Sequence, residues 1–145
     1  MTAEQPPRVW AEIPCGYEGC GRTAAVIELI PRGAAYADGR TDILHELNIP
    51  GLSELGTFRL SGFLPFTGFS THVARYEAVV AAVRGAGDRV DAVLHALAKE
   101  YAPYFCATCD RSYCEAHWNL HAVFDYGFDY YTGACLFGHK KFIDH

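Results

Sequence analysis

The chain has 145 residues, of which 50% are apolar and 20% are charged, and its formal net charge at pH 7 is -5. This length and composition predict one compact domain with its own core and exclude a largely disordered chain. The negative charge disfavours general binding to nucleic acid, which needs clustered Lys and Arg, so a protein partner is the better hypothesis.

The start of the chain, residues 1–12, contains Glu4, Arg8 and Glu12 and is expected to be a flexible N-terminus. It has no apolar export signal, and apolar runs elsewhere are shorter than the roughly 18 to 20 residues that cross a bilayer. We therefore expect a cytoplasmic protein. Because the cytosol is reducing, its six cysteines are expected to be metal ligands or buried thiols. A secreted disulfide protein is the alternative.

Strands are predicted over residues 23–30, 41–47 and 57–64, because these segments are rich in apolar and β-branched residues and end near Pro or Gly. The dipeptide Asp38-Gly39 is typical of a hairpin turn between the first two strands.

Two helices are predicted next. The first has a cap at Ser70 or Thr71 and ends at Gly85, since apolar residues recur between them at spacings of three and four. The second begins at Asp88 and stops before Pro103.

The predicted fold class is therefore α+β, with a small sheet and two helices over residues 23–103. This unit is an insert between two parts of a Cys/His region, residues 13–22 and 104–145, and together they form one domain over residues 13–145. Helical and strand periodicity fades after Cys106, so we expect a metal to organise that part of the chain.

The candidate metal ligands form four short pairs that use every cysteine. Structural zinc takes four Cys or His ligands, so eight ligands fill two tetrahedral sites and two zinc ions are expected. Loading would bring the net charge near -7, because six thiolates and two Zn²⁺ ions add -2 to the -5 of the chain. The pairs are Cys15 with Cys20, Cys106 with Cys109, Cys114 with His117, and Cys135 with His139.

Three arrangements of these pairs are open. In the sequential arrangement the first two pairs share one ion and the last two share the other. In the cross-braced arrangement the first pair joins the third and the second joins the fourth. In the third arrangement one site closes within residues 106–117 and the outer pairs share the other ion. His121 could also replace His117 as a ligand.

The run from Tyr104 to Trp118, with Cys106-x2-Cys109 and Cys114-x2-His117, resembles the zinc-binding core of RING, in-between-RING and related treble-clef fingers. Preceded by Cys15-x4-Cys20, its spacing is especially similar to in-between-RING domains, which implies the sequential arrangement. The long gap after Cys20 and the Cys135-x3-His139 pair depart from that family. The run is also similar to small bacterial proteins that end in a Tyr-Cys-x2-His-Trp finger.

A non-catalytic zinc-binding module for protein interaction is the leading functional hypothesis, because Cys-rich sites leave no open position for a substrate or water. No catalytic residue is assigned. The RING resemblance implies an alternative, a ubiquitin-ligase-type adaptor that docks a ubiquitin-like conjugating enzyme near Tyr17 and Ala107. A zinc hydrolase is a further alternative.

Candidate partner-binding residues are aromatic, since such side chains are enriched at interfaces. Those in the segment 123–133 could instead simply cover the zinc sites. The candidates are Tyr17, Trp118, Phe124, Tyr126, Phe128 and Tyr130.

Overall fold

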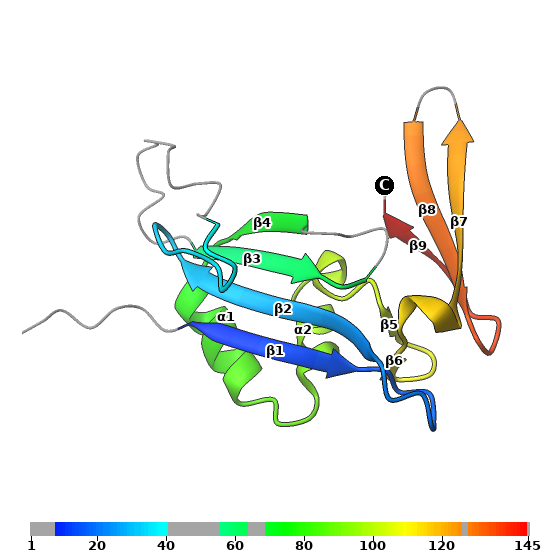
Figure 1. The fold of residues 1–145 in the computed structure, drawn as a ribbon, viewed down its shortest axis with the longest axis horizontal. Coiled ribbons are helices and arrows are strands. Elements are labelled where there is room, and N and C mark those ends of the chain that lie inside the picture. Colours follow the sequence, from blue (N-terminus) through cyan, green and yellow to red (C-terminus); the bar gives the residue numbers. More distant parts are fainter. Residues whose placement is uncertain (1–7, 41–55, 64–68, 126–127, 145) are drawn as a thin grey trace, which may run out of the picture.

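The computed structural model describes residues 8–40, 56–63, 69–125 and 128–144. Within these residues the chain forms an α+β fold with a four-stranded, a two-stranded and a three-stranded antiparallel sheet (Figure 1). The α+β prediction is thus confirmed.

The four-stranded sheet has the order β1-β2-β3-β4, in which consecutive strands pair. Its strands are β1 (Val9–Pro14), β2 (Thr23–Pro31), β3 (Gly56–Ser61) and β4 (Phe69–Val73). The strands predicted over residues 23–30 and 57–64 correspond to β2 and β3, although residue 64 lies outside the described part. The strand predicted over residues 41–47 lies outside the described residues.

The turn predicted at Asp38-Gly39 is confirmed. The Gly39 N–H donates to the carbonyl oxygen of Tyr36 at 2.9 Å, and Gly39 has φ 87°. Glycine adopts this left-handed conformation without the steric penalty that other residues incur.

The strand β1 corrects the predicted flexible N-terminus, because residues 9–12 pair with β2. Val9, Ala11 and Ile13 are buried or half-buried and pack on the core, whereas Trp10 and Glu12 between them are exposed. This alternation has the period of a strand and is visible in the sequence.

The first helix begins later than predicted. Ser70 and Thr71, its expected caps, lie in β4 opposite β3, and α1 (Tyr76–Arg84) begins after Arg75, which has φ 56°. Thr71 and Val73 are β-branched residues, which suit a pleated sheet, and the pairing of β4 with β3 satisfies the backbone hydrogen-bonding groups of the strand. The predicted end at Gly85 is confirmed, since its N–H donates to Ala81 at 3.0 Å.

Both helices cover one face of the four-stranded sheet (Figure 1). The buried side of α1 carries Tyr76, Val79, Val80 and Val83. The second helix, α2 (Val90–Leu97), begins two residues after the predicted Asp88 and buries Leu94; the short 3₁₀ helix η2 (Lys99–Tyr101) follows it.

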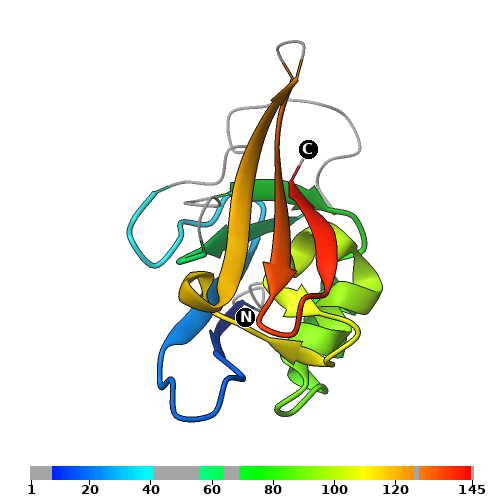
Figure 2. The same ribbon diagram turned by 90° about the vertical axis from the view of Figure 1, so that its right-hand side faces the viewer.

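The C-terminal part has more regular structure than predicted. After the two-stranded sheet of β5 (Phe105–Cys106) and β6 (Arg111–Ser112) comes the 3₁₀ helix η3 (Glu115–His117). A three-stranded sheet then stands at one end of the molecule, as Figure 2 shows. Its strands are β7 (Trp118–Asp125), β8 (Phe128–Cys135) and β9 (Lys140–Asp144).

None of the helices in the described residues has the length and apolar character needed to cross a membrane.

The contact between β3 and α1 gives a first testable prediction. A Cβ added at Gly56 would lie 2.1 Å from Cδ2 of the buried Tyr76 ring, so Gly56→Ala must displace this ring. We expect Gly56→Ala to lower the free energy of unfolding by about 1–3 kcal/mol, measured by urea denaturation.

The control is the same substitution in a Tyr76→Ala background, where the clash is absent. Gly56→Ala should then cost less than half as much. An equal cost in both backgrounds would refute the packing explanation.

Candidate metal centres

The eight predicted ligands lie in two groups of four, each with three cysteines and one histidine. Within each group the ligand atoms all lie within 4.8 Å of one another, so each group could hold a metal ion. Site 1 consists of Cys15, Cys20, Cys114 and His117, and site 2 consists of Cys106, Cys109, Cys135 and His139.

This grouping is the cross-braced arrangement among the three that the sequence left open. The sequential arrangement, which the in-between-RING resemblance implies, is therefore wrong for this chain. So is the arrangement that closes one site within residues 106–117. His121 lies in β7 opposite Thr132, with an exposed side chain, and belongs to neither site.

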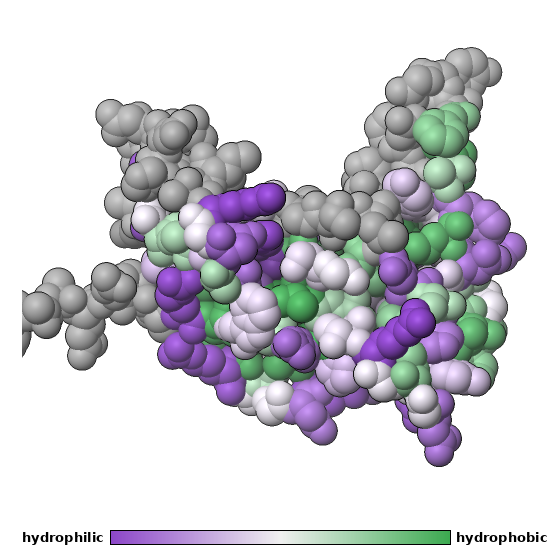
Figure 3. Space-filling model, in the orientation of Figure 1, coloured by the Kyte–Doolittle hydropathy of each residue, from purple (hydrophilic) through white to green (hydrophobic). Residues whose placement is uncertain are grey.

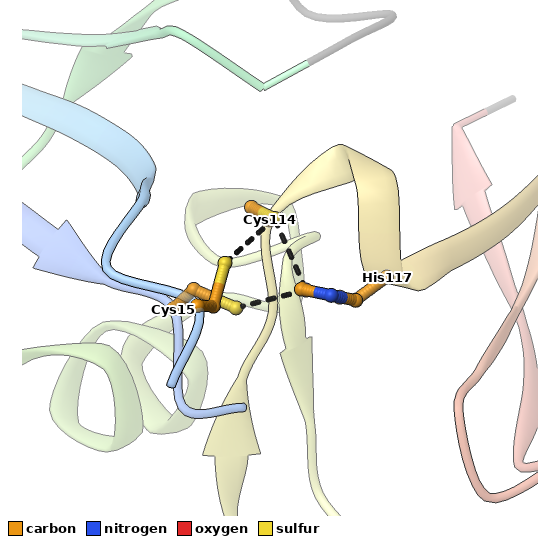
Figure 4. Close-up of side chains that lie close together, drawn as sticks. Cys15, Cys114 and His117 are labelled. Carbon is orange, nitrogen blue, oxygen red and sulfur yellow. Dashed lines mark hydrogen bonds between the residues drawn. The ribbon is translucent and has the colours of Figure 1, made fainter. Parts of the chain in front are cut away.

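Site 1 joins the turn between β1 and β2 to the segment after β6. The Nδ1 atom of His117 lies 3.3 Å from the sulfurs of Cys15 and Cys114, and these three side chains point toward one another (Figure 4). The Cys20 sulfur lies 3.8 Å from that of Cys114. The Tyr17 ring packs on the His117 imidazole with centroids 4.5 Å apart, which orients the ligand.

The turn of site 1 is also fixed by its backbone. Cys15 N–H donates to Arg22 at 2.9 Å, and Gly16 N–H donates to the Ser112 carbonyl oxygen of β6. A Cβ at Gly16 would lie 2.9 Å from this oxygen, so only glycine permits the close approach.

Site 2 joins the turn between β5 and β6 to the turn between β8 and β9. The Nδ1 atom of His139 lies 3.6, 3.3 and 3.2 Å from the sulfurs of Cys106, Cys109 and Cys135, and the last two sulfurs are 3.7 Å apart. Gly138, with φ 83°, lets the chain curl from Cys135 back to His139.

Backbone amides donate to two of the site 2 sulfurs. Cys109 N–H approaches the Cys106 sulfur at 3.5 Å, and Phe137 N–H approaches the Cys135 sulfur at 3.4 Å. Such donors stabilise thiolates and hold metal ligands in orientation.

The pKa is raised for two of these cysteines and lowered for two others. Burial raises the pKa of Cys106 and of Cys114 to about 11. For Cys135 burial acts in the same direction, but N–H groups of His139 and Phe137 and neighbouring thiols lower its pKa to about 7. A backbone hydrogen bond at Arg22 lowers the pKa of Cys20. Metal binding at neutral pH therefore has to displace protons from Cys106 and Cys114.

Lys141 lies close enough to site 2 for charge on two of its cysteines to act on the lysine. Its Nζ donates to the Phe105 carbonyl oxygen and lies 5.1 Å from the centroid of the Trp118 ring. Burial lowers the pKa of Lys141 to about 8, whereas negative charge on Cys106 and Cys135 favours its charged form. Sequence reasoning missed this residue, because its distance from the sulfurs depends on the pairing of β9 with β8.

The predicted partner-binding residues have different environments. Phe124 is 76% exposed, and Tyr17 is exposed although its ring packs on His117. Tyr126 lies outside the described residues, and Phe128 and Tyr130 lie in β8.

The prediction that Trp118 binds a partner is wrong, because this side chain is only 5% exposed and cannot contribute to a docking surface. Its Nε1 donates to the carbonyl oxygens of Tyr104 and Tyr113, both at 3.1 Å. A buried indole needs such a partner for its N–H, and here it ties the start of β7 to the two-stranded sheet.

The fold and the two groups define an α+β protein with two Cys3His sites, each of which could hold a metal ion. A family model described as a domain of unknown function (DUF8328) matches residues 8–145, and the chain belongs to this family. No curated protein and no solved structure matches it.

Pairs of cysteine substitutions test the cross-braced arrangement. Cys15→Ser with Cys114→Ser damages site 1 alone, so this variant should lose about one metal ion per chain by elemental mass spectrometry. Cys15→Ser with Cys106→Ser damages both sites and should lose about two.

Each variant removes two thiols, so each is a control for the other. A sequential arrangement gives the opposite result, with the first variant losing both ions and the second losing one. That outcome would contradict the grouping described above.

Proposed function

We propose that this protein is a non-catalytic interaction module in which two structural zinc ions hold loops in position for a protein partner. The donor set supports zinc, since three thiolates and one imidazole are ligands that Zn²⁺ takes in structural sites.

The distances between ligand atoms are the observation that carries the proposal. A tetrahedron with Zn–S of about 2.3 Å and Zn–N of about 2.0 Å has S···S edges of about 3.8 Å and S···N edges of about 3.5 Å. The S···S distances above are 3.8 and 3.7 Å, and the S···N distances span 3.2 to 3.6 Å. A disulfide would need about 2.05 Å between sulfurs, and the six cysteines are free.

The number of ligands supports a structural role over a hydrolase. A catalytic zinc ion has three protein ligands and an open position for water. Four protein ligands complete the tetrahedron at each site, so neither ion would offer a place to activate water.

The path of the chain between the ligands supports a stapling role. Site 1 ties the β1–β2 turn to the segment after β6, and site 2 ties the β5–β6 turn to the β8–β9 turn. The two ions would together fasten the C-terminal sheet to the four-stranded sheet through β5 and β6.

The outer surface of the C-terminal sheet supports a partner-docking role. Figure 3 shows apolar side chains at the surface of the end that carries β7 to β9. In the turn of site 2, Leu136 is 45% exposed and Phe137 is 64% exposed. Exposed apolar side chains on a rigid turn are a frequent basis of protein docking, because little entropy is lost when they bind.

Metal removal should loosen the C-terminal part more than the four-stranded sheet. After chelation we expect amide hydrogen exchange of β7 to β9 to accelerate by about tenfold or more, because both sites adjoin the end of this sheet where β7 begins and β8 ends, and both are lost. Amides of β2 and β3 should keep most of their protection.

Cys20→Ser, which damages site 1 alone, is the matched comparison and should give a smaller change in β8 and β9 than chelation. If chelation removed protection uniformly from all strands, the ions would hold the whole fold and the stapling role would be refuted.

The apolar turn can be tested with a surface variant. Leu136→Ser with Phe137→Ser keeps the Phe137 backbone N–H that donates to Cys135, so metal content should be unchanged. We expect at least about a tenfold loss in cross-linking to proteins in an extract of the source cells, measured by quantitative mass spectrometry.

Trp10→Ser is the control, because Trp10 is also exposed and lies in β1. It should keep the partners that the turn variant loses. Equal capture by the wild type, the turn variant and the control would refute this surface.

A further inference from the structure

A cavity of about 800 Å³ adjoins site 2. Its walls come from α2 and η2, from β5 with the turn after it, and from β9 with the residues before it. Cys106 and His139 of site 2 are among its lining residues. The volume lies within the range of small-molecule sites, about 300–1,000 Å³.

Positive charge is concentrated in this cavity. The chain contains three lysines, and all three line it, namely Lys99, Lys140 and Lys141. Among the described residues that line the cavity, Glu100 is the one with a carboxylate. A zinc ion with three thiolates would add one negative charge, so the lysines still outweigh the acidic groups.

The lysines differ in how firmly they are held. Lys141 is fixed by the Phe105 carbonyl oxygen and the Trp118 ring, whereas Lys99 and Lys140 are exposed and can turn toward a ligand. In a chain of net charge -5, such a cluster attracts anions against the field of the whole molecule.

His95 adds a polar group without a charge. Burial, together with the positive charges of Lys141 and Lys99, lowers the pKa of His95, so its imidazole is neutral at pH 7. A neutral imidazole can donate one hydrogen bond and accept another, which suits an oxygen-rich ligand.

The rest of the lining is largely apolar. Pro103, Phe105 and Ile143 are buried, and Phe142 is 70% exposed. Lysines beside aromatic and aliphatic walls are suited to a ligand with an anionic group at one end and an apolar body at the other.

We propose that this cavity binds a small organic anion, with a carboxylate or phosphate group among the three lysines and an aromatic or aliphatic body against Phe105 and Phe142. The site goes beyond the interaction module proposed above, because it binds a small molecule and needs no protein partner.

The test is a titration of the ¹⁵N-labelled, metal-loaded full chain, followed by NMR, with phenyl phosphate, benzoate, inorganic phosphate and benzyl alcohol. Phenyl phosphate or benzoate should shift the amides of residues 139–143 and bind at least about tenfold tighter than neutral benzyl alcohol. The tighter of the two identifies the anionic group. Raising the salt concentration to about 0.3 M should weaken binding of the anions.

Lys99→Gln with Lys140→Gln should lower the affinity for the tighter probe by about tenfold, because two positive charges at the mouth are lost. Neither residue is a metal ligand, and unchanged metal content would show that site 2 is intact. Arg40→Gln with Arg84→Gln removes the same charge outside the cavity lining and should leave the affinity within about twofold.

Three results would overturn the proposal. These are benzyl alcohol binding as tightly as the anions, equal affinities of the two double variants, and inorganic phosphate binding as tightly as phenyl phosphate. The last result would show that the apolar wall contributes nothing.

Discussion

Mutual repulsion of three thiolates is the constraint on which each Cys/His site depends. Three cysteine sulfurs within 4.8 Å of one another repel strongly when ionised, and burial adds to this cost. Burial, and after it the neighbouring cysteines, raise the pKa of Cys106 and of Cys114, so without a bound cation the proton stays on these sulfurs at neutral pH. A divalent cation replaces the protons and converts repulsion into attraction. In the proposed function, folding of the C-terminal part and metal binding are therefore one linked equilibrium.

The segment of β5 and β6 connects the two Cys/His sites to each other. It supplies Cys106 and Cys109 to site 2 and is followed at once by Cys114 of site 1, so ligands of both sites lie on one short stretch of the chain. The indole of Trp118 holds the same segment through two carbonyl oxygens. The Gly16 N–H donates a hydrogen bond to the Ser112 carbonyl oxygen, which links this segment to the turn after β1. The C-terminal sheet is thus attached to the four-stranded sheet through a small and highly cross-linked region.

The features that the sequence predicted correctly, the ligand pairs and the helical stripe, depend on the spacing of residues close together in the chain. Cys-x2-Cys and Cys-x2-His identify ligands because both members reach one ion from a single turn, and the stripe of α1 from Tyr76 to Val83 has a helical period. Which two pairs share an ion depends on where the chain returns after Cys20. Between Cys20 and Cys106 the chain passes through a sheet and two helices, and no local sequence pattern predicts the end of that path. Trp118 was misjudged for a related reason, since burial of an aromatic side chain is set by tertiary contacts. The alternation in β1 is a local pattern that the sequence does contain, although the charged residues around it favour a flexible N-terminus.

Site 2 differs from site 1 in what it positions. Site 1 lies between the two parts of the chain, with the Tyr17 ring over its histidine. Site 2 fixes two turns that carry other features: Phe137 is exposed on the β8–β9 turn, and Lys140 and Lys141 of the cavity follow His139 directly. Fixing these turns before a partner or ligand arrives lowers the entropy lost on binding. Loss of the ion at site 2 would therefore weaken both proposed surfaces together, whereas loss at site 1 would act on them only through the attachment of the C-terminal sheet.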